Sequence, residues 1–454
     1  MSALRLLLTL AVATGWASSL LAATIVLPYG GGPDTVTLSR PWGHRSVDVG
    51  LLIDATGTMM GEASNLKSGM STLFASLQAN YPDLRMGIAV YMDWPCSPHG
   101  VAGDLPFQLR QRCTSNMTAL IFAINAISPA PGSGGDGPES GCDALHYAIT
   151  GLAGAAPACG ATAIAAFNPS SNQVPGVADG AGGGMGFRDD GRATQVLIQF
   201  TDDESKDSVS CAFSGPVGRP RALAELVAHQ CRFGAVYSGV AGNTGHNQLR
   251  QLSEVSSTIT PPAYGVSPVF CETGINGTGM TPIGGGCPNV FELSSAGTGA
   301  STAAAQAVIE ALDASPFRLT SSAAGTPTPG GSSTDFLQSA EFVAAGNPSF
   351  APAPVLSPSA IDGSFATGTY DLRLILENLD VPPGSSAQTF PLYVHVLAGN
   401  AVVARDTLLI EVPGPVGVGS PHGGSPLTLR SLTENPFATD WAASWCCRTK
   451  ARPG

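Results

Sequence analysis

The chain has 454 residues, which is enough for two or three domains that each bury a hydrophobic core. Charged residues are only 12% of the sequence, against roughly 25% in an average domain, while 56 glycines and 36 prolines indicate many loops. The formal net charge of −12 argues against nucleic acid or an anionic membrane as a partner and suits a protein that binds cations.

The N-terminal segment, residues 1–23, is typical of an export signal. Arg5 precedes the apolar stretch LLLTLAVATGWASSLLAA, whose small residues suit cleavage between Ser19 and Ala23. The alternative is a buried or membrane helix. No later stretch reaches about 18 uninterrupted apolar residues, so we expect no transmembrane segment in the mature chain. We therefore expect a secreted protein, located outside the cell, in the periplasm or at the cell surface.

Strand-like and helix-like patterns alternate through residues 46–315. The apolar runs that predict strands are VDVGLLID, RMGIAVYMD, PFQLRQR, ATQVLIQFTD, RFGAVYSGV and NVFELS. The helical patterns cover residues 64–79, 116–127, 141–153, 220–230, 246–256 and 298–313. Near-continuous apolar strands separated by helices are typical of a sheet that is buried on both faces. The sequence therefore predicts an α/β domain with a doubly wound, mostly parallel sheet.

The pattern changes after residue 315. The segment TSSAAGTPTPGGSST lies within residues 316–334, which we interpret as a linker. Residues 335–413 contain short alternating runs and no convincing helix, which predicts a small all-β sandwich. Residues 24–45 form a separate N-terminal strand segment, and residues 414–454 are interpreted as a flexible tail.

Ten cysteines fit an oxidising compartment. Eight of them fall in successive pairs of similar spacing, which makes neighbour pairing a hypothesis among many possible connectivities. The candidate pairs are Cys96/Cys113, Cys142/Cys159, Cys211/Cys231 and Cys271/Cys287. The sequence contains no C-x-x-C pair and no H-E-x-x-H motif, and its histidines are scattered, so we do not expect a zinc site.

Oxygen-bearing side chains follow three of the predicted elements. Asp54, Thr56 and Thr58 come after the first strand, Thr201 to Asp203 follow ATQVLIQF, and Asp136 and Glu139 lie in a glycine-rich loop before a helix. In a doubly wound sheet these segments meet at one edge. Carboxylates and hydroxyls favour Mg²⁺, Ca²⁺ or Mn²⁺ over zinc or copper. The alternatives are a helix N-cap for the threonines and a solvated turn for TDDES.

These segments resemble the I-like domain of integrin β subunits, which has the von Willebrand factor type A fold. The resemblance covers residues 46–315 and runs through VDVGLLIDATGTM, RMGIAVYMD, DGPESGCDAL, GFRDDGRATQVLIQFTDD and NVFELSSAGTGASTAAAQAVIEAL. Its most specific elements are D-x-[ST]-x-[ST] and D-x-P-E. The resemblance implies a metal-ion-dependent adhesion site for Mg²⁺ or Mn²⁺, formed by Asp54, Thr56, Thr58, Glu139 and Asp202.

The resemblance also implies two flanking Ca²⁺ sites, and the match to both is partial. Asp93, Asp136, the Pro138 carbonyl and Glu139 correspond to one of them, but Gly134 stands where the family has an asparagine ligand. At the other site Gly61 and Glu62 stand where the family has two acids. Glu62 is the one acid that remains, and it is a weak candidate ligand for a third metal ion.

Two further expectations follow from the resemblance. Because the I-like domain of the family is inserted into a sandwich, the segment 24–45 is expected to pair with residues 335–413; the alternative is a free-standing arm. The cysteine-rich repeats, transmembrane helix and cytoplasmic tail of an integrin β chain have no counterpart in this sequence, so we do not expect signalling across a membrane.

The leading functional hypothesis is a secreted, non-enzymatic adhesion or protein-binding module. Through a divalent cation it would bind a protein ligand that presents an Asp or Glu carboxylate. One alternative is a metal-assisted hydrolase, although no G-x-S-x-G or P-loop motif occurs and the nearest histidine in sequence is His146, beyond Asp143. Another is a structural extracellular matrix or surface component in which the metal only steadies the loops.

Overall fold

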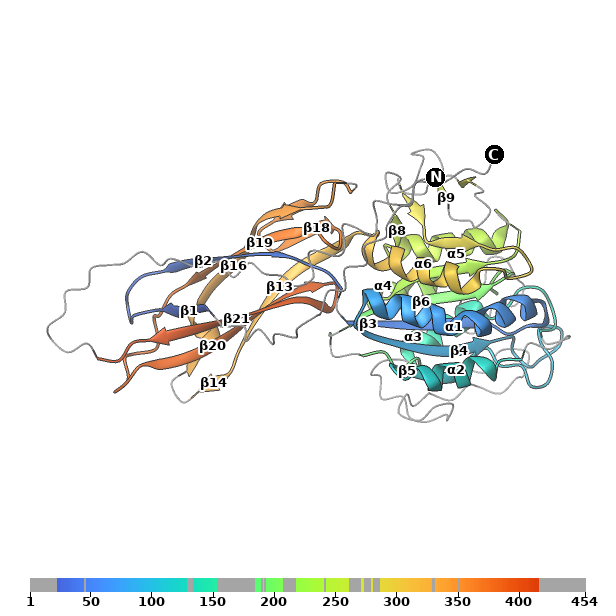
Figure 1. Ribbon diagram of the computed structural model, residues 1–454, viewed down its shortest axis with the longest axis horizontal. Helices are drawn as coiled ribbons and strands as arrows, with labels where there is room; N and C mark the ends of the chain where they lie inside the picture. Colours follow the sequence, from blue (N-terminus) through green and yellow to red (C-terminus); the bar gives the residue numbers. More distant parts are fainter. Residues whose placement is uncertain are drawn as a thin grey trace, which may run out of the picture.

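The computed structural model describes residues 23–415, apart from 45, 129–133, 153–183, 189–190, 192, 207–217, 241, 261–270, 273–278, 281–285, 329–330 and 350. The molecule is elongated, with an α/β region at one end and a region of strands at the other (Figure 1). The expected export signal at residues 1–23, except its last residue, and nearly all of the expected tail at residues 414–454 lie outside the described residues. Within the described part, no helix has the length and apolar character needed to cross a membrane.

The α/β region is built on a six-stranded sheet in the order β12-β7-β6-β3-β4-β5. All neighbours are parallel except β5, which runs antiparallel to β4 at one edge. The strands are β3 (Ser46–Asp54), β4 (Asp83–Tyr91), β5 (Gln108–Thr114), β6 (Thr194–Thr201), β7 (Arg232–Tyr237) and β12 (Val290–Glu292). This order reverses between β3 and β6, as in a doubly wound fold.

Helices cover the two faces of this sheet (Figure 1). They are α1 (Met60–Asn80), α2 (Met117–Asn125), α3 (Gly141–Thr150), α4 (Arg219–Ala228), α5 (Thr244–Val255) and α6 (Ala300–Asp313). One hydrophobic cluster joins α1, α2 and α6 to Leu51 and Ile53 of β3, and a second joins α3, α4 and α5 to Leu52. Because successive residues of β3 enter different cores, the strand needs a continuous apolar run.

Most of the remaining strands form two sheets that share a third hydrophobic cluster. The cluster includes Leu372 from the three-stranded sheet β16-β19-β2 and Leu392 from the six-stranded sheet β1-β21-β20-β13-β18-β17. The strands are β1 (Ala23–Val26), β2 (Asp34–Pro41), β13 (Phe317–Gly325), β16 (Leu337–Gly346), β17 (Val355–Ser357), β18 (Ala360–Ser364), β19 (Thr369–Leu376), β20 (Gln388–Ala398) and β21 (Ala401–Val412).

The N-terminal segment belongs to this second region. β1 pairs in parallel with β21, and β2 pairs antiparallel with β19 along its whole length. Figure 1 shows both strands, in blue, lying among the orange and red strands from the other end of the sequence. The α/β region is therefore inserted between strands of the second region, and the chain passes between the two regions twice.

The expectation of a linker at 316–334 is wrong for its first half. Phe317–Gly325 forms β13, a central strand that pairs with β20 on one side and β18 on the other. Only Phe317 and Leu319 are buried apolar residues of this strand. After Leu319 the strand continues as TSSAAG, whose small residues carry no alternation of apolar and polar side chains. Its pairing with β20 holds this part of the strand in the sheet.

Three of the proposed disulfide pairs are also wrong. Cys113, Cys142 and Cys231 are not disulfide-bonded, and all three are buried in the hydrophobic cluster that contains α3, α4 and α5. Their predicted disulfide bonds to Cys96, Cys159 and Cys211 are therefore not formed. A buried thiol packs as a small apolar side chain, and these three cysteines contribute to the hydrophobic core in that way. Cys96 and Cys287 are disulfide-bonded. The pairing of Cys287 with Cys271 stays a prediction.

Candidate metal centre

The candidate site lies at the carboxyl edge of the α/β sheet, where the strand order reverses. Asp54 is the last residue of β3 and Thr201 is the last residue of β6, and these strands are paired in parallel up to Ile53 and Phe200. In a doubly wound fold the crevice outside this pair of strand ends is the usual place for a ligand.

Asp54 is fully buried and is held by donors from both strands. Its Oδ1 accepts hydrogen bonds from the backbone N–H of Thr56 at 2.9 Å and from the Thr56 hydroxyl at 2.7 Å. Its Oδ2 accepts from the hydroxyl of Thr201 at 3.0 Å. Burial raises the pKa of Asp54 to about 7, against the lowering effect of the Thr56 backbone hydrogen bond, and the charge of Asp202 raises it further. The carboxylate is therefore fixed in orientation, and no cationic side chain is among the causes that set its pKa.

The two threonines after β3 do not act as a helix cap. Thr56 stands at the N-cap position of a short 3₁₀ turn, η1 (Gly57–Met59), but its side chain makes no capping hydrogen bond. Its Oγ1 lies 3.4 Å from Oγ1 of Thr58. The Thr58 hydroxyl also bonds to Asp202, whose pKa is raised by burial in spite of that bond. Thr56 thus contacts both Asp54 and Thr58, and Thr58 in turn contacts Asp202.

Glu139 approaches the same centre from the loop before α3. It is 5% exposed, and its Oε2 is buried with no hydrogen-bond partner. Burial, followed by the charges of Asp54 and Asp93, raises the pKa of Glu139 far above its usual range. A Cβ placed on Gly134 would lie 3.1 Å from Cγ2 of Thr56 and 3.4 Å from Oε1 of Glu139. The glutamate therefore lies beside both Thr56 and Asp54.

The main chain fixes this approach. The backbone N–H of Glu139 donates to the carbonyl of Glu204 at 2.8 Å, and the carbonyl of Glu139 accepts from the N–H of Lys206 at 2.7 Å. These bonds form an isolated parallel bridge between Glu139 and Ser205. The loop that carries Glu139 is therefore attached directly to the segment that follows β6 and carries Asp202.

The donor set fits a hard divalent cation. All five side chains offer oxygen. Burial raises the pKa values of Asp54, Glu139 and Asp202, and the charges of neighbouring acids raise those of Asp54 and Glu139 further, a repulsion that a cation would relieve. In the described part of the chain, no three acidic, histidine or cysteine side chains group closely enough to hold a metal by themselves. An ion at this centre would therefore depend on the hydroxyls of Thr56 and Thr58 as well as on Asp54, Glu139 and Asp202.

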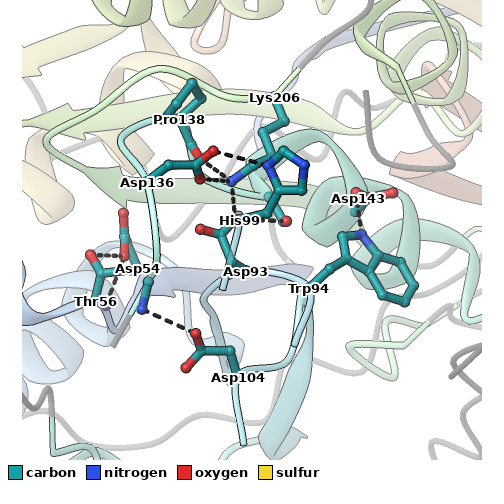
Figure 2. A network of polar contacts seen from close by, with 12 residues as sticks. Asp54, Thr56, Asp93, Trp94, His99, Asp104, Asp136, Pro138, Asp143 and Lys206 are labelled. Carbon is teal, nitrogen blue, oxygen red and sulfur yellow. Dashed lines mark hydrogen bonds and ion pairs between the residues drawn. The ribbon is translucent and has the colours of Figure 1, made fainter. Parts of the chain in front are cut away.

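The residues matched to the second ion also come together, but around a lysine. The ammonium of Lys206 lies 2.8 Å from Oδ1 of Asp136 and donates to Oδ1 of Asp93 and to the Pro138 carbonyl (Figure 2). Burial alone would lower the pKa of Lys206, but the charge of Asp93 and the bonds to Asp136 raise it overall. The sequence-based hypothesis of a Ca²⁺ site at Asp93, Asp136, Pro138 and Glu139 did not include this charged side chain.

Two further residues that the sequence did not single out hold the same loop. Asp104 is 3% exposed and accepts from the N–H of Gly134 at 3.1 Å, and Gly134 has a φ of +79° that favours glycine. Nδ1 of His99 lies 2.9 Å from Oδ2 of Asp136. Both side chains come from the segment between β4 and β5, for which the sequence predicts no helix or strand, so only the folded chain places them beside the site.

The third ligand set lacks room for a second acid. A Cβ at Gly61 would lie 2.9 Å from the backbone oxygen of Ala296, because α1 begins directly against that loop. Glu62 is 2% exposed, and its Oε2 is buried without a hydrogen-bond partner. Burial raises its pKa, with a hydrogen bond from Ser238 opposing the shift. Glu62 therefore faces the end of β7 as a single acid.

His146, the histidine nearest to the site in sequence, lies elsewhere. It is 1% exposed, and its Nδ1 lies 2.8 Å from both carboxylate oxygens of Glu225 on α4. This contact joins α3 to α4 on one face of the sheet. His146 is therefore a packing residue between two helices.

No protein-family model matches this chain, and no curated protein sequence matches it. Solved structures with a similar architecture include a von Willebrand factor type A protein from Catenulispora acidiphila, at 12% identity and a TM-score of 0.32, covering 85% of this chain and 71% of that one. The SpRpn10 VWA domain matches at 10% identity and a TM-score of 0.31, covering 57% of this chain and 95% of that chain.

A third similar structure is the pilus adhesin SpaC from Lactobacillus rhamnosus GG in an open conformation. It matches at 12% identity and a TM-score of 0.31, covering 86% of this chain and 46% of the adhesin. At this level of identity the likenesses concern the fold and say nothing about a ligand.

Proposed function

We propose that this chain is a secreted, non-enzymatic adhesion or protein-binding module. Its α/β domain would take an acidic side chain of a protein ligand through a Mg²⁺ or Mn²⁺ ion at a metal-ion-dependent adhesion site. The two sheets of the second region would act as one sandwich that carries this domain. The resemblance of residues 46–315 to the integrin β I-like domain suggested this function.

One observation carries the proposal. Glu139 carries a buried carboxylate with an oxygen that has no hydrogen-bond partner, and the charge of Asp54, a second buried carboxylate, helps to raise the pKa of Glu139. Two buried acids side by side are unfavourable unless a proton or a cation lies between them. The hydroxyls of Thr56 and Thr58 and the carboxylate of Asp202 complete a set of hard oxygen donors around the same point.

The ion would supply a Lewis acid with exchangeable positions. A hard cation bound by a few side chains keeps water at its other positions, and the carboxylate of another molecule can replace one of these waters. The protein would hold the donors still, through the hydrogen bonds from Thr56 and Thr201 to Asp54 and the backbone bridge at Glu139. Such binding requires no covalent step.

The proposal is tested with metal and peptides on the full chain. Titration calorimetry with MgCl₂ and MnCl₂ should show binding to the wild type and none to Asp54→Ala or Asp202→Ala. The matched control is Asp380→Ala, which removes an exposed aspartate from the second region. Circular dichroism should show that all variants are folded.

The same proteins are then applied to an array of peptides that each carry one Asp or Glu, paired with Asn or Gln versions. Binding to the acidic member only, in Mg²⁺ and not in EDTA, is the expected result. Unchanged binding in EDTA would contradict the proposal. A rise in Tm with Mg²⁺ but no acidic peptide bound would favour a structural metal in a matrix or surface component.

The contact between His99 and Asp136 favours one rival function. It brings a histidine to the edge of the candidate site, where a metal-assisted hydrolase would need a base. Turnover of simple carboxylate or phosphate esters by the wild type, lost in both Asp54→Ala and His99→Gln, would support the hydrolase and overturn a purely binding role.

A further inference from the structure

Lys206 is a charged side chain buried inside a ring of oxygens. Its side chain is 1% exposed, and its ammonium contacts two carboxylates, from Asp93 and Asp136, and one backbone carbonyl, from Pro138. Figure 2 shows these three groups directed at the lysine, Asp93 from one segment and Asp136 and Pro138 from another. Carboxylates and backbone carbonyls are the ligands that Ca²⁺ usually takes in proteins.

We propose that the ammonium of Lys206 takes the place of a second divalent cation, so that the loop carrying Glu139 is held without Ca²⁺. Where the first site binds an ion, as proposed above, that ion would then have no Ca²⁺ neighbour at Asp93 and Asp136. This inference concerns the lysine's own contacts and does not depend on which ligand, if any, the first site captures.

The contacts of Lys206 connect the same segments that a bridging ion would connect. Asp93 lies just beyond β4, whereas Asp136 and Pro138 lie in the loop before α3. The backbone of Lys206 extends this connection, because its N–H donates to the carbonyl of Glu139 at 2.7 Å. One residue therefore holds the loop through its side chain and through its main chain.

A covalently attached cation differs from a bound ion in two ways. It does not dissociate, so the loop is positioned at any Ca²⁺ concentration. It also carries one positive charge instead of two, and His99 lies 2.9 Å from the other oxygen of Asp136. Removing the ammonium would leave two carboxylates and a carbonyl facing an unfilled position, which is unfavourable for a buried charge.

The test uses a background in which the first site is disabled. In Asp54→Ala, the chain with Lys206 should show no Ca²⁺ binding by calorimetry and no change in Tm with CaCl₂. The double variant Asp54→Ala/Lys206→Ala should have a lower Tm in EDTA. It should gain one Ca²⁺ per chain, with a Kd on the order of 10⁻³ M or tighter, as in weak extracellular sites.

Three companion variants control for loss of fold and loss of charge. Lys67→Ala, on α1, should behave like its parent in every measurement. Lys206→Arg keeps the positive charge and should gain no Ca²⁺ binding. Lys206→Gln keeps most of the side-chain volume, and it replaces Lys206→Ala in the comparison if the alanine variant does not fold in EDTA.

Two outcomes would overturn the inference. One is Ca²⁺ binding of equal strength with Lys206 present and absent in the Asp54→Ala background. The other is a folded Lys206→Ala or Lys206→Gln protein that gains no Ca²⁺ binding and no Ca²⁺-dependent rise in Tm. Because the first site is disabled in this background, either result can be read whatever becomes of Mg²⁺ binding at Asp54.

Discussion

The hydroxyl of Thr201 donates a hydrogen bond to Oδ2 of Asp54 at 3.0 Å, between the two strands where the sheet order reverses. Oδ1 of the same carboxylate is bound by Thr56, from the loop that follows β3. Asp54 is therefore oriented by residues on both sides of the crevice, and its orientation depends on the pairing of β3 with β6.

The first prediction concerns this hydrogen bond. Thr201→Val keeps the shape of the side chain but removes the donor, leaving a buried carboxylate oxygen with one partner fewer. We expect the free energy of unfolding of the metal-free protein to fall by about 1 to 3 kcal/mol, as measured by urea denaturation. Thr72→Val, at an exposed position on α1, is the control and should change little. Equal effects of the two substitutions would show that the hydrogen bond from Thr201 to Asp54 does not contribute to the free energy of unfolding.

The second prediction concerns pH. Burial raises the pKa of Asp54 to about 7 in the metal-free chain, whereas an unfolded aspartate has a pKa of about 4. The folded chain therefore binds the proton more tightly than the unfolded chain. The contribution to stability is present in full below about pH 4 and is lost as the pH rises through the folded pKa. Mg²⁺ competes with this proton, so its affinity should rise over the same interval.

The measurement compares the wild type with Asp54→Asn, which does not titrate at this position. In EDTA, the Tm of the wild type should fall more between about pH 4 and about pH 7 than the Tm of Asp54→Asn. Calorimetry should give tighter Mg²⁺ binding by the wild type at the upper end of this range. Parallel pH profiles for the two proteins would contradict the assignment of the shift to Asp54.

The third prediction concerns the start of α1. An alanine at residue 61 would place its Cβ 2.9 Å from the backbone oxygen of Ala296 and 3.2 Å from that of Ser295. Replacing glycine by alanine in a helix gains about 1 kcal/mol, but a clash with backbone atoms costs about 1 to 3 kcal/mol. We therefore expect Gly61→Ala to lower the free energy of unfolding. Gly43→Ala is the control, because a Cβ there meets no atom within 4 Å.

The Gly61 result also bears on the third ligand set. An acid at residue 61 would need the same space as alanine and more, so Gly61→Asp should destabilise the protein without adding an ion. A gain in the number of Ca²⁺ ions bound by Gly61→Asp would contradict the close packing of α1 against the loop at Ala296.

The fourth prediction concerns the junction between the two regions. The guanidinium of Arg232 donates to the carbonyls of Ser256 and Ser257 and, at 2.6 Å, to that of Pro316, and it lies 3.7 Å from the centre of the Phe317 ring. Lysine keeps the charge but loses the planar fork. We expect Arg232→Lys to lower the free energy of unfolding by about 2 to 3 kcal/mol.

Arg221→Lys is the control for this junction, because Arg221 is 54% exposed and pairs with Glu225 on the same helix. Its effect should stay below about 0.5 kcal/mol. Limited proteolysis should also cut Arg232→Lys faster near residue 316. Equal stability of the two arginine variants would mean that Arg232 does not hold the junction.

Much of the α/β region could be predicted from local patterns. Each of its six main strands overlaps a predicted apolar run, and each of its six helices overlaps a predicted helical segment; α1, for example, is Met60–Asn80 against an expected 64–79. These elements bury wide apolar faces, which leave a regular signature in the sequence. Where burial does not use large apolar side chains, as in β13, the same reasoning failed.

The sequence by itself determined which residue types could form the proposed metal centre. The acid and two threonines after β3, the D-x-P-E loop and the acids after β6 are local features, and the order of strands implied that they would meet. The sequence also determined that the donors are oxygens, since no nitrogen or sulfur donor occurs among them. The chemical class of the proposed ion follows from that alone.

Only the tertiary structure decided what lies between these segments. The contacts of Lys206 with Asp93 and Pro138, of Asp104 with Gly134 and of Thr201 with Asp54 join residues that are 113, 68, 30 and 147 positions apart. A single charged or polar residue in a loop has no periodicity from which its partner could be inferred. The folded chain brings these residues together because the main-chain bridge at Glu139 and the parallel strands place their loops at one edge of the sheet.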